Sequence, residues 1–202
     1  FVIALLTTTV CLFIAYPTAY ILARGGFRKS GVWMLLLVTP MWINFTLRIT
    51  ALKEVLNLIE GNLAFHPLFN AVLCMVYDFL PFMILPIYNS IARIKPDVIE
   101  AAKDLGANSR IVLIRIIFPL TLSGVISGIV MVFVPALTSF VISDLLGGGK
   151  VLLIGNVIEQ EFMQGSNWNL GSGLSVVLMI FVIASMAVMN IFDKDQGGTA
   201  VW

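Results

Sequence analysis

Four side chains have the chemistry to bind a positively charged solute, because carboxylates attract cations and aromatic faces add cation–π attraction. Asp144 precedes the glycine run 147–149 at the end of a long apolar segment, and Asp78 lies within another apolar segment, beside Tyr77. Trp42 stands within a third. Charge in lipid is costly, so an intramembrane carboxylate must face a cavity, water or a partner. We expect Asp144, Asp78, Tyr77 and Trp42 to line a solute pathway; the alternative for Asp78 is an internal ion pair.

The sequence gives no comparable evidence for an enzyme active site. His66 is the single histidine, which excludes a multi-histidine metal site and argues against a serine–histidine protease. The run 147–150 reads Gly-Gly-Gly-Lys, as at the end of a phosphate-binding loop, but Asp144 stands where that pattern needs glycine and Val151 where it needs serine or threonine. We therefore expect no catalytic residue, no metal site and no cofactor in this chain.

A charged hairpin at about 93–118 differs from the apolar segments on either side. Pro96 suits the first turn of a helix, and Asp97 falls where the helix dipole favours an acid. A glycine ten residues after Pro96 predicts the helix end. This pattern predicts a short surface helix with an exposed carboxylate and two outward-facing alanines, to which a soluble partner can dock. The carboxylate is that of Glu100, the alanines are Ala101 and Ala102, and the terminating glycine is Gly106.

The elements that must position these residues are membrane helices. The chain is 59% hydrophobic and 11% charged, whereas a soluble domain carries about 25% charge. Its formal net charge of +1 gives no field that favours nucleic acid. A bilayer core about 30 Å thick needs roughly 20 apolar residues in a helix, and no barrel-like alternation appears. We predict an all-α polytopic membrane protein with spans at Phe1–Ala23, Gly31–Ala51, Pro67–Ala92, Pro119–Ile142 and Leu170–Phe192.

The basic residues predict the orientation of these spans. Nine of the 12 lysines and arginines fall in the first loop, the third loop and the C-terminal segment, which the positive-inside rule places in the cytoplasm. The hairpin is then cytoplasmic, and Asp144 is external. We expect the segment 143–169 to form an external gate that includes an interfacial helix over Val151–Met163. Glu159 and Glu161 in that helix face the solute, an external partner or water.

Gly124 and Gly128 have the GxxxG spacing that permits close approach of membrane helices. Two partners for this face are open: another membrane subunit, or a helix of the same chain.

The hairpin also carries a family resemblance. Its pattern E-A-A-x-x-x-G followed by I-x-x-P, from Glu100 to Pro119, resembles the coupling loop of permease subunits in binding-protein-dependent ABC importers. Leucine usually precedes the proline in that family, where this chain has Phe118. Further segments are similar to the B-type membrane subunit of spermidine/putrescine importers, so that the resemblance covers most of the chain. These segments are Tyr16–Tyr20, Leu80–Met83, Ser143–Leu145 and Leu153–Asn156.

The resemblance implies the type I ABC importer permease fold, as one transmembrane domain over residues 1–202. The family usually has six spans, which implies one more span upstream of the five counted here. It further implies a polyamine permease in the bacterial cytoplasmic membrane. The implied partners are a dimer of ATP-binding subunits that holds ATP and Mg²⁺, a second permease subunit and an extracytoplasmic substrate-binding protein. In the family this loop seats in a groove on the ATP-binding subunit, so Glu100 and Gly106 would carry the coupling, with Ala101 and Ala102 packing against that partner.

Two alternatives remain open from the residues. Related permeases move other small solutes, such as amino acids or metal complexes. A secondary ion-coupled carrier would need two related halves with interrupted helices, which are not visible here, and it would leave the hairpin without a role.

Overall fold

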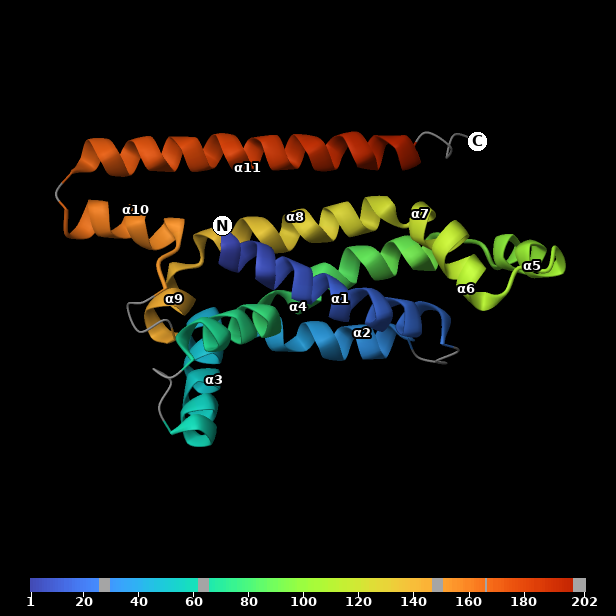
Figure 1. Ribbon diagram of the computed structural model, residues 1–202, viewed down its shortest axis with the longest axis horizontal. Helices are drawn as coiled ribbons and strands as arrows, with labels where there is room; N and C mark the ends of the chain where they lie inside the picture. Colours follow the sequence, from blue (N-terminus) through green and yellow to red (C-terminus); the bar gives the residue numbers. More distant parts are fainter. Residues whose placement is uncertain (26–29, 62–65, 147–150, 166, 198–202) are drawn as a thin grey trace.

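The computed structural model describes residues 1–25, 30–61, 66–146, 151–165 and 167–197, and these residues are helical almost throughout, with no strand among them. The helices run side by side as a long bundle, with a hairpin at one end and short transverse helices at the other (Figure 1). The helices of the first half are α1 (Val2–Arg24), α2 (Ser30–Val38), the 3₁₀ turn η1 (Thr39–Trp42), α3 (Phe45–Glu60) and α4 (Pro67–Arg93). Those of the second half are α5 (Pro96–Asp104), α6 (Ser109–Ile111), a π-helical segment (Val112–Ile117), α7 (Phe118–Leu120), α8 (Leu122–Thr138), α9 (Phe140–Leu146), α10 (Ile154–Met163) and α11 (Trp168–Gly197).

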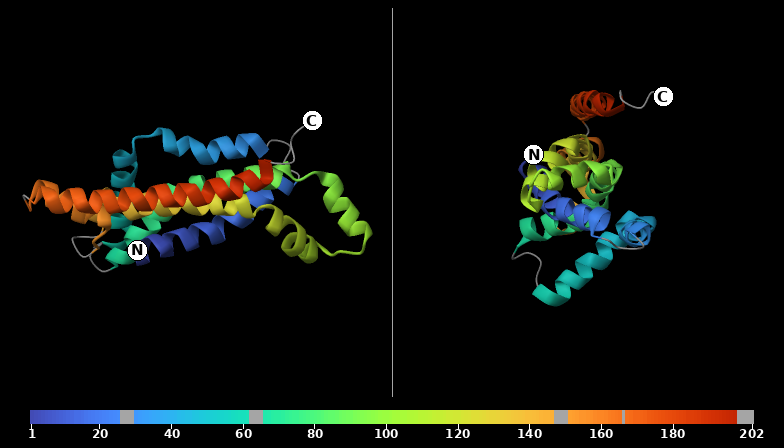
Figure 2. Two further views of the ribbon diagram at one scale, coloured as in Figure 1. Left: turned by 90° about the horizontal axis from the view of Figure 1, so that it is seen from above. Right: turned by 90° about the vertical axis from the view of Figure 1, so that its right-hand side faces the viewer.

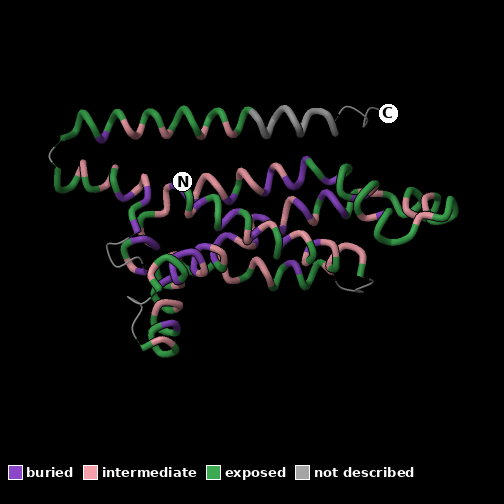
Figure 3. The backbone as a smooth tube through the Cα atoms, in the orientation of Figure 1, coloured by how far each residue is buried: buried purple, intermediate pink, exposed green. Residues whose placement is uncertain are grey.

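Helices α1, α4 and α8 form the core of the bundle, each packed against the other two. One face of α1 is built of small side chains that are completely buried: Ala4, Cys11, Ala15 and Ala19. Small residues let membrane helices approach closely, which replaces the hydrophobic driving force that lipid removes. Buried residues accordingly recur along the length of all three helices (Figure 3).

The GxxxG face of α8 packs within the same chain. A methyl group at Gly124 would lie 2.6 Å from Cβ of Ser90 and 2.7 Å from the carbonyl oxygen of Pro86, and one at Gly128 would lie 2.7 Å from Sδ of Met83. All three neighbours belong to α4. Of the two partners that the spacing left open, the structure therefore shows the helix of the same chain.

The predicted second span, Gly31–Ala51, is not one continuous helix. The segment Ser30–Trp42, which is α2 with η1, meets α3 at an angle of 94°, and the break lies between Trp42 and Phe45. Pro40 has no amide hydrogen to continue α2, and the side chain of Asn44 caps the new helix by accepting from the amides of Thr46 (3.0 Å) and Leu47 (3.4 Å). Helix α3 therefore runs across the end of the bundle (Figure 2). An average over an apolar window does not detect such a break.

The predicted fourth span, Pro119–Ile142, contains α8 but extends past both of its ends. The segment Ser109–Leu120 meets Leu122–Thr138 at an angle of 64°, so that α8 starts after Thr121 and ends at Thr138. The first, third and fifth predicted spans agree closely with α1, α4 and α11. Three helices are long and apolar enough to cross a membrane, and up to five spans result if each bent pair counts as one, within the described residues.

Candidate functional site

The hairpin of α5 and α6 projects from the end of the bundle that also holds the end of α1 (Figure 1). Pro96 occupies the first turn of α5, as predicted, and Asp97 follows it. Gly106 ends the helix with φ of +84°, a conformation that glycine adopts without steric cost. The amide of Gly106 donates to the carbonyl of Lys103 (2.8 Å), and that of Ala107 to the carbonyl of Ala102 (3.0 Å). The prediction that Gly106 terminates the hairpin helix is confirmed.

The exposed side of α5 is partly apolar. Glu100 and Ala101 are exposed, whereas Ala102 is half-buried and packs toward the core of the subunit. The two alanines therefore divide between the two sides of the helix. Leu105 is 89% exposed, beside the terminating glycine. Its position was not singled out from sequence, although an apolar residue next to a helix-ending glycine is a visible signal. A single exposed leucine does not by itself indicate a partner, but it adds apolar area beside Glu100 and Ala101.

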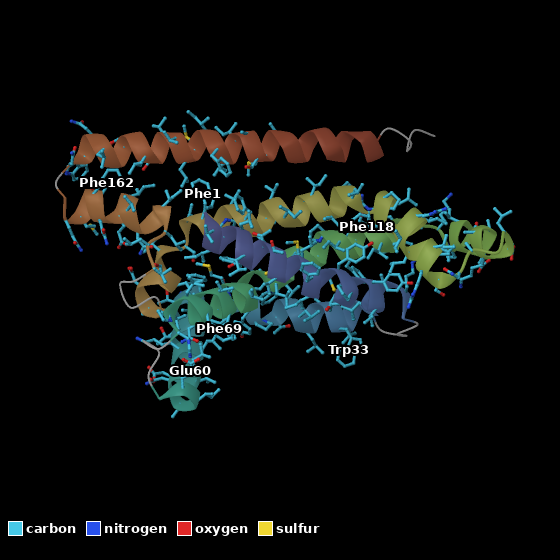
Figure 4. The ribbon with its side chains drawn as sticks, in the orientation of Figure 1. Phe1, Trp33, Glu60, Phe69, Phe118 and Phe162 are labelled. Carbon is cyan, nitrogen blue, oxygen red and sulfur yellow. The ribbon has the colours of Figure 1, made fainter. Side chains whose placement is uncertain are left out.

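The returning arm of the hairpin is not a continuous helix. Asn108 caps α6 by accepting from the amide of Ile111 at 2.9 Å, and the chain then widens into the π-helical segment Val112–Ile117. Such segments are rare and occur frequently at functional sites. The arm ends at Phe118, which lies near the junction of the hairpin with the bundle (Figure 4), and at the 64° bend.

Asp78 forms an internal ion pair rather than facing an open pathway. Its carboxylate binds the guanidinium of Arg48 on α3, and the two side chains are 2% and 9% exposed. Arg48 also donates to the carbonyl of Pro40 at 2.9 Å. The ion pair therefore fastens the bend between η1 and α3 onto α4. Of the two interpretations of Asp78, the structure favours the internal pair, with its partner in this same chain.

Asp144 lies at the opposite end of the bundle from the hairpin, exposed on α9. Its carboxylate accepts a hydrogen bond of 2.6 Å from the side chain of Asn156, which is 2% exposed at the start of α10. Gly155 holds α10 close to α8, because a methyl group there would lie 2.3 Å from the carbonyl oxygen of Thr138. The glycine run after Asp144 lies outside the described residues.

An open hollow of about 360 Å³ lies between Asp144 of α9 and the side chains of α10. Two carboxylates face it without a basic residue among its lining side chains in the described part of the chain. The lining residues are Asp144, Glu159, Gln160, Met163 and Gln164. An arrangement of two carboxylates and two amide side chains can bind an ammonium group by charge and by hydrogen bonds.

The two aromatic candidates are not gathered around Asp144. Trp42 is 88% exposed at the bend after α2, and Tyr77 is 46% exposed on α4. Among the described residues, neither has a hydrogen bond or ring contact with Asp144. Their place in a solute pathway stays a prediction.

Comparison with known proteins gives independent evidence of the family. Residues 3–195 match the family described as binding-protein-dependent transport system inner membrane component. The spermidine/putrescine transport system permease protein PotB of Haemophilus influenzae is 37% identical over 191 residues, which are 88% of this chain and 67% of that protein. PotB of Escherichia coli is 39% identical over 194 residues, which are 88% of this chain and 70% of that protein.

One solved structure has the same fold. A chain of the MetNI methionine ABC transporter, in inward-facing conformations, superposes with a TM-score of 0.65, covering 95% of this chain and 92% of that chain. The sequences are 18% identical, so the likeness shows the fold alone.

Proposed function

Because the chain belongs to the family of binding-protein-dependent transport system inner membrane components, we propose that it is the permease subunit of an ATP-driven importer of polyamines in the bacterial cytoplasmic membrane. The assignment of polyamines as the substrate rests on the 37–39% identity to spermidine/putrescine permeases over 88% of the chain. The membrane helices and the type I ABC permease fold support the transport role.

The energy for transport comes from a partner. The phosphate-loop pattern fails at Asp144 and Val151, so we propose that ATP and Mg²⁺ are held by a dimer of separate ATP-binding subunits. The docking element is α5 at the cytoplasmic end of the bundle, where Glu100 and Ala101 of the helix and Leu105, which follows it, are exposed. A second permease subunit completes the pathway, and an extracytoplasmic binding protein delivers the solute.

Transport then proceeds by alternating access. ATP binding closes the nucleotide subunits and displaces α5, and this displacement opens the bundle outward. The solute passes from the binding protein into the hollow between α9 and α10, where Asp144 and Glu159 receive its ammonium groups. ATP hydrolysis returns the bundle to the inward-facing state.

Reconstitution with the ATPase, second permease and binding protein tests this function directly. We expect spermidine or putrescine, with the binding protein, to raise ATP hydrolysis several-fold and to drive uptake into proteoliposomes. An amino acid at the same concentration is the control. Stimulation by another solute, with no response to either polyamine, would reject the substrate and retain the permease.

The carboxylate of Asp144 should contribute to the uptake rate. Asp144→Asn removes the charge but keeps an oxygen that can accept from Asn156, so α9 and α10 should stay in place. A partly exposed ion pair is worth about 1 kcal/mol, and we expect spermidine uptake at saturating binding protein to fall about fivefold. The matched control is Glu161→Gln, which removes the same charge from α10 outside the hollow. Equal uptake by the two variants would exclude Asp144 from the pathway.

A further inference from the structure

The coupling hairpin is joined to the bundle by two hinges, and α1 binds both of them. The outgoing hinge is formed by Ile91 and Ile94 at the end of α4, immediately before α5 begins at Pro96. The returning hinge is Thr121, where the 64° bend separates the hairpin arm from α8. Neither the sequence patterns nor the proposed function assigns a role to the α1 side chains at these points.

Arg24, the last residue of α1, holds the outgoing hinge. Its guanidinium donates to the carbonyl of Ile91 at 3.1 Å and also to the carbonyl of Ile94. The last carbonyls of a helix have no partner within the helix, and a cation there also opposes the negative end of the helix dipole. Arg24 therefore binds the very residues from which the chain turns into α5.

Tyr16 holds the returning hinge. Its hydroxyl lies 3.2 Å from the hydroxyl of Thr121, which itself donates to the carbonyl of Phe118 at 3.1 Å. Tyr16 is therefore the donor in the pair. Its ring also packs on Phe118, with 5.7 Å between the ring centroids. Thr121 is completely buried, so this hydrogen bond is shielded from water.

The two contacts come from one rigid element. Tyr16, Tyr20 and Arg24 follow one another at intervals of four residues, which places them along one side of α1, and Tyr16 and Arg24 lie about 12 Å apart along the helix axis. Tyr20 and Arg24 also line a cavity of about 240 Å³ together with Glu100 and Lys103 of the hairpin. This side of α1 therefore follows the hairpin from one hinge to the other.

We propose that α1 transmits the displacement of the coupling helix to the transmembrane bundle, with Arg24 and Tyr16 as positioning residues at the two hinges. The inference rests on the proposed docking of α5 to an ATPase. When α5 moves, both hinges move with it, and because α1 is bound to each, its small-residue face carries the movement into α4 and α8. Loss of either contact uncouples the nucleotide cycle from the opening of the bundle.

A cysteine reporter at the external hollow tests this inference without needing the solute. In the assembled complex, Gln164→Cys is labelled with a membrane-impermeant maleimide before and after trapping with ATP and vanadate, with other subunits free of accessible cysteine. The native cysteines, Cys11 and Cys74, are both 0% exposed and should not react. We expect trapping to change the labelling rate several-fold. Arg24→Gln should reduce that change at least threefold while the ATPase still co-purifies.

Matched variants separate positioning from general structure. Arg93→Gln removes a cation from the same end of α4, and Arg93 has no hydrogen bond to α1 among the described residues; it should behave as the parent. Arg24→Lys should restore part of the change, because an ammonium can still donate to the carbonyls. If Arg24→Gln prevents assembly, Tyr16→Phe, which removes one hydroxyl and keeps the ring, provides the test, with Tyr20→Phe as its control.

A full nucleotide-dependent change in Arg24→Gln, or in Tyr16→Phe where the first variant does not assemble, would overturn the role of α1. This result is distinct from failure of the proposed substrate. If the parent complex responds to nucleotide but not to polyamines, the substrate assignment fails and the α1 inference is still decided by the reporter.

Discussion

Replacing Gly106 with leucine is expected to lower polyamine uptake at least tenfold while leaving the transmembrane bundle folded. Gly106 has φ of +84°, and no atom lies within 4 Å of the position that a Cβ would occupy. A Cβ at this position meets no other atom, so the expected cost is backbone strain of about 1–2 kcal/mol. The strain is relieved if α5 continues past Leu105 or tilts, which moves Glu100 and Leu105 away from the ATPase. Uptake and co-purification of the ATPase measure the effect.

The chain offers a close control for this substitution. Gly61 also has positive φ, of +71°, with open space around it, but it ends α3 at the opposite end of the bundle. Gly61→Leu imposes a similar strain away from the hairpin and should retain most of the uptake. Gly106→Asn should recover much of the loss, because asparagine tolerates this conformation better than leucine does. Normal uptake in Gly106→Leu would show that the orientation of α5 does not govern coupling.

Breaking the buried ion pair is expected to have the largest effect on folding. Asp78→Leu leaves Arg48 charged and enclosed, and removal of one partner of a buried pair costs about 3–5 kcal/mol. By the usual scaling for domains of this size, the thermal midpoint of the purified protein should fall by roughly 10 °C. The matched variant is Arg48→Met with Asp78→Leu, which removes both charges and should recover most of the stability.

Uptake by the double variant also decides between the two roles of Asp78. If the carboxylate only fastens α3 onto α4, the double variant should fold and transport. If Asp78 binds solute ammonium groups, it should fold and fail to transport. A single Asp78→Leu variant as stable as the parent would contradict the ion pair itself.

Local sequence rules predicted the parts of the molecule that depend on few residues. The limits of α1 and α4 follow from apolar length, and the end of α5 follows from one glycine. The bend after α2 was missed because the window 31–51 is apolar on average across it, although Pro40 and the capping Asn44 mark the break. The pairing of Asp78 was only half predicted, because Arg48 is 30 residues away in sequence and lies in a different predicted span, Gly31–Ala51. The contacts of Arg24 and Tyr16 depend on tertiary packing, and no sequence pattern points to them.

The glycine at position 155 helps to connect the two ends of the bundle. It allows α10 to rest directly on the backbone at the end of α8, while the other end of α8 begins at the hinge next to the hairpin. Helix α8 is 17 residues long, or about 25 Å. One helix thus joins the hollow between α9 and α10 to the hinge at Thr121. If α5 docks to an ATPase as proposed, we expect the shape of the hollow to change with the state of that partner.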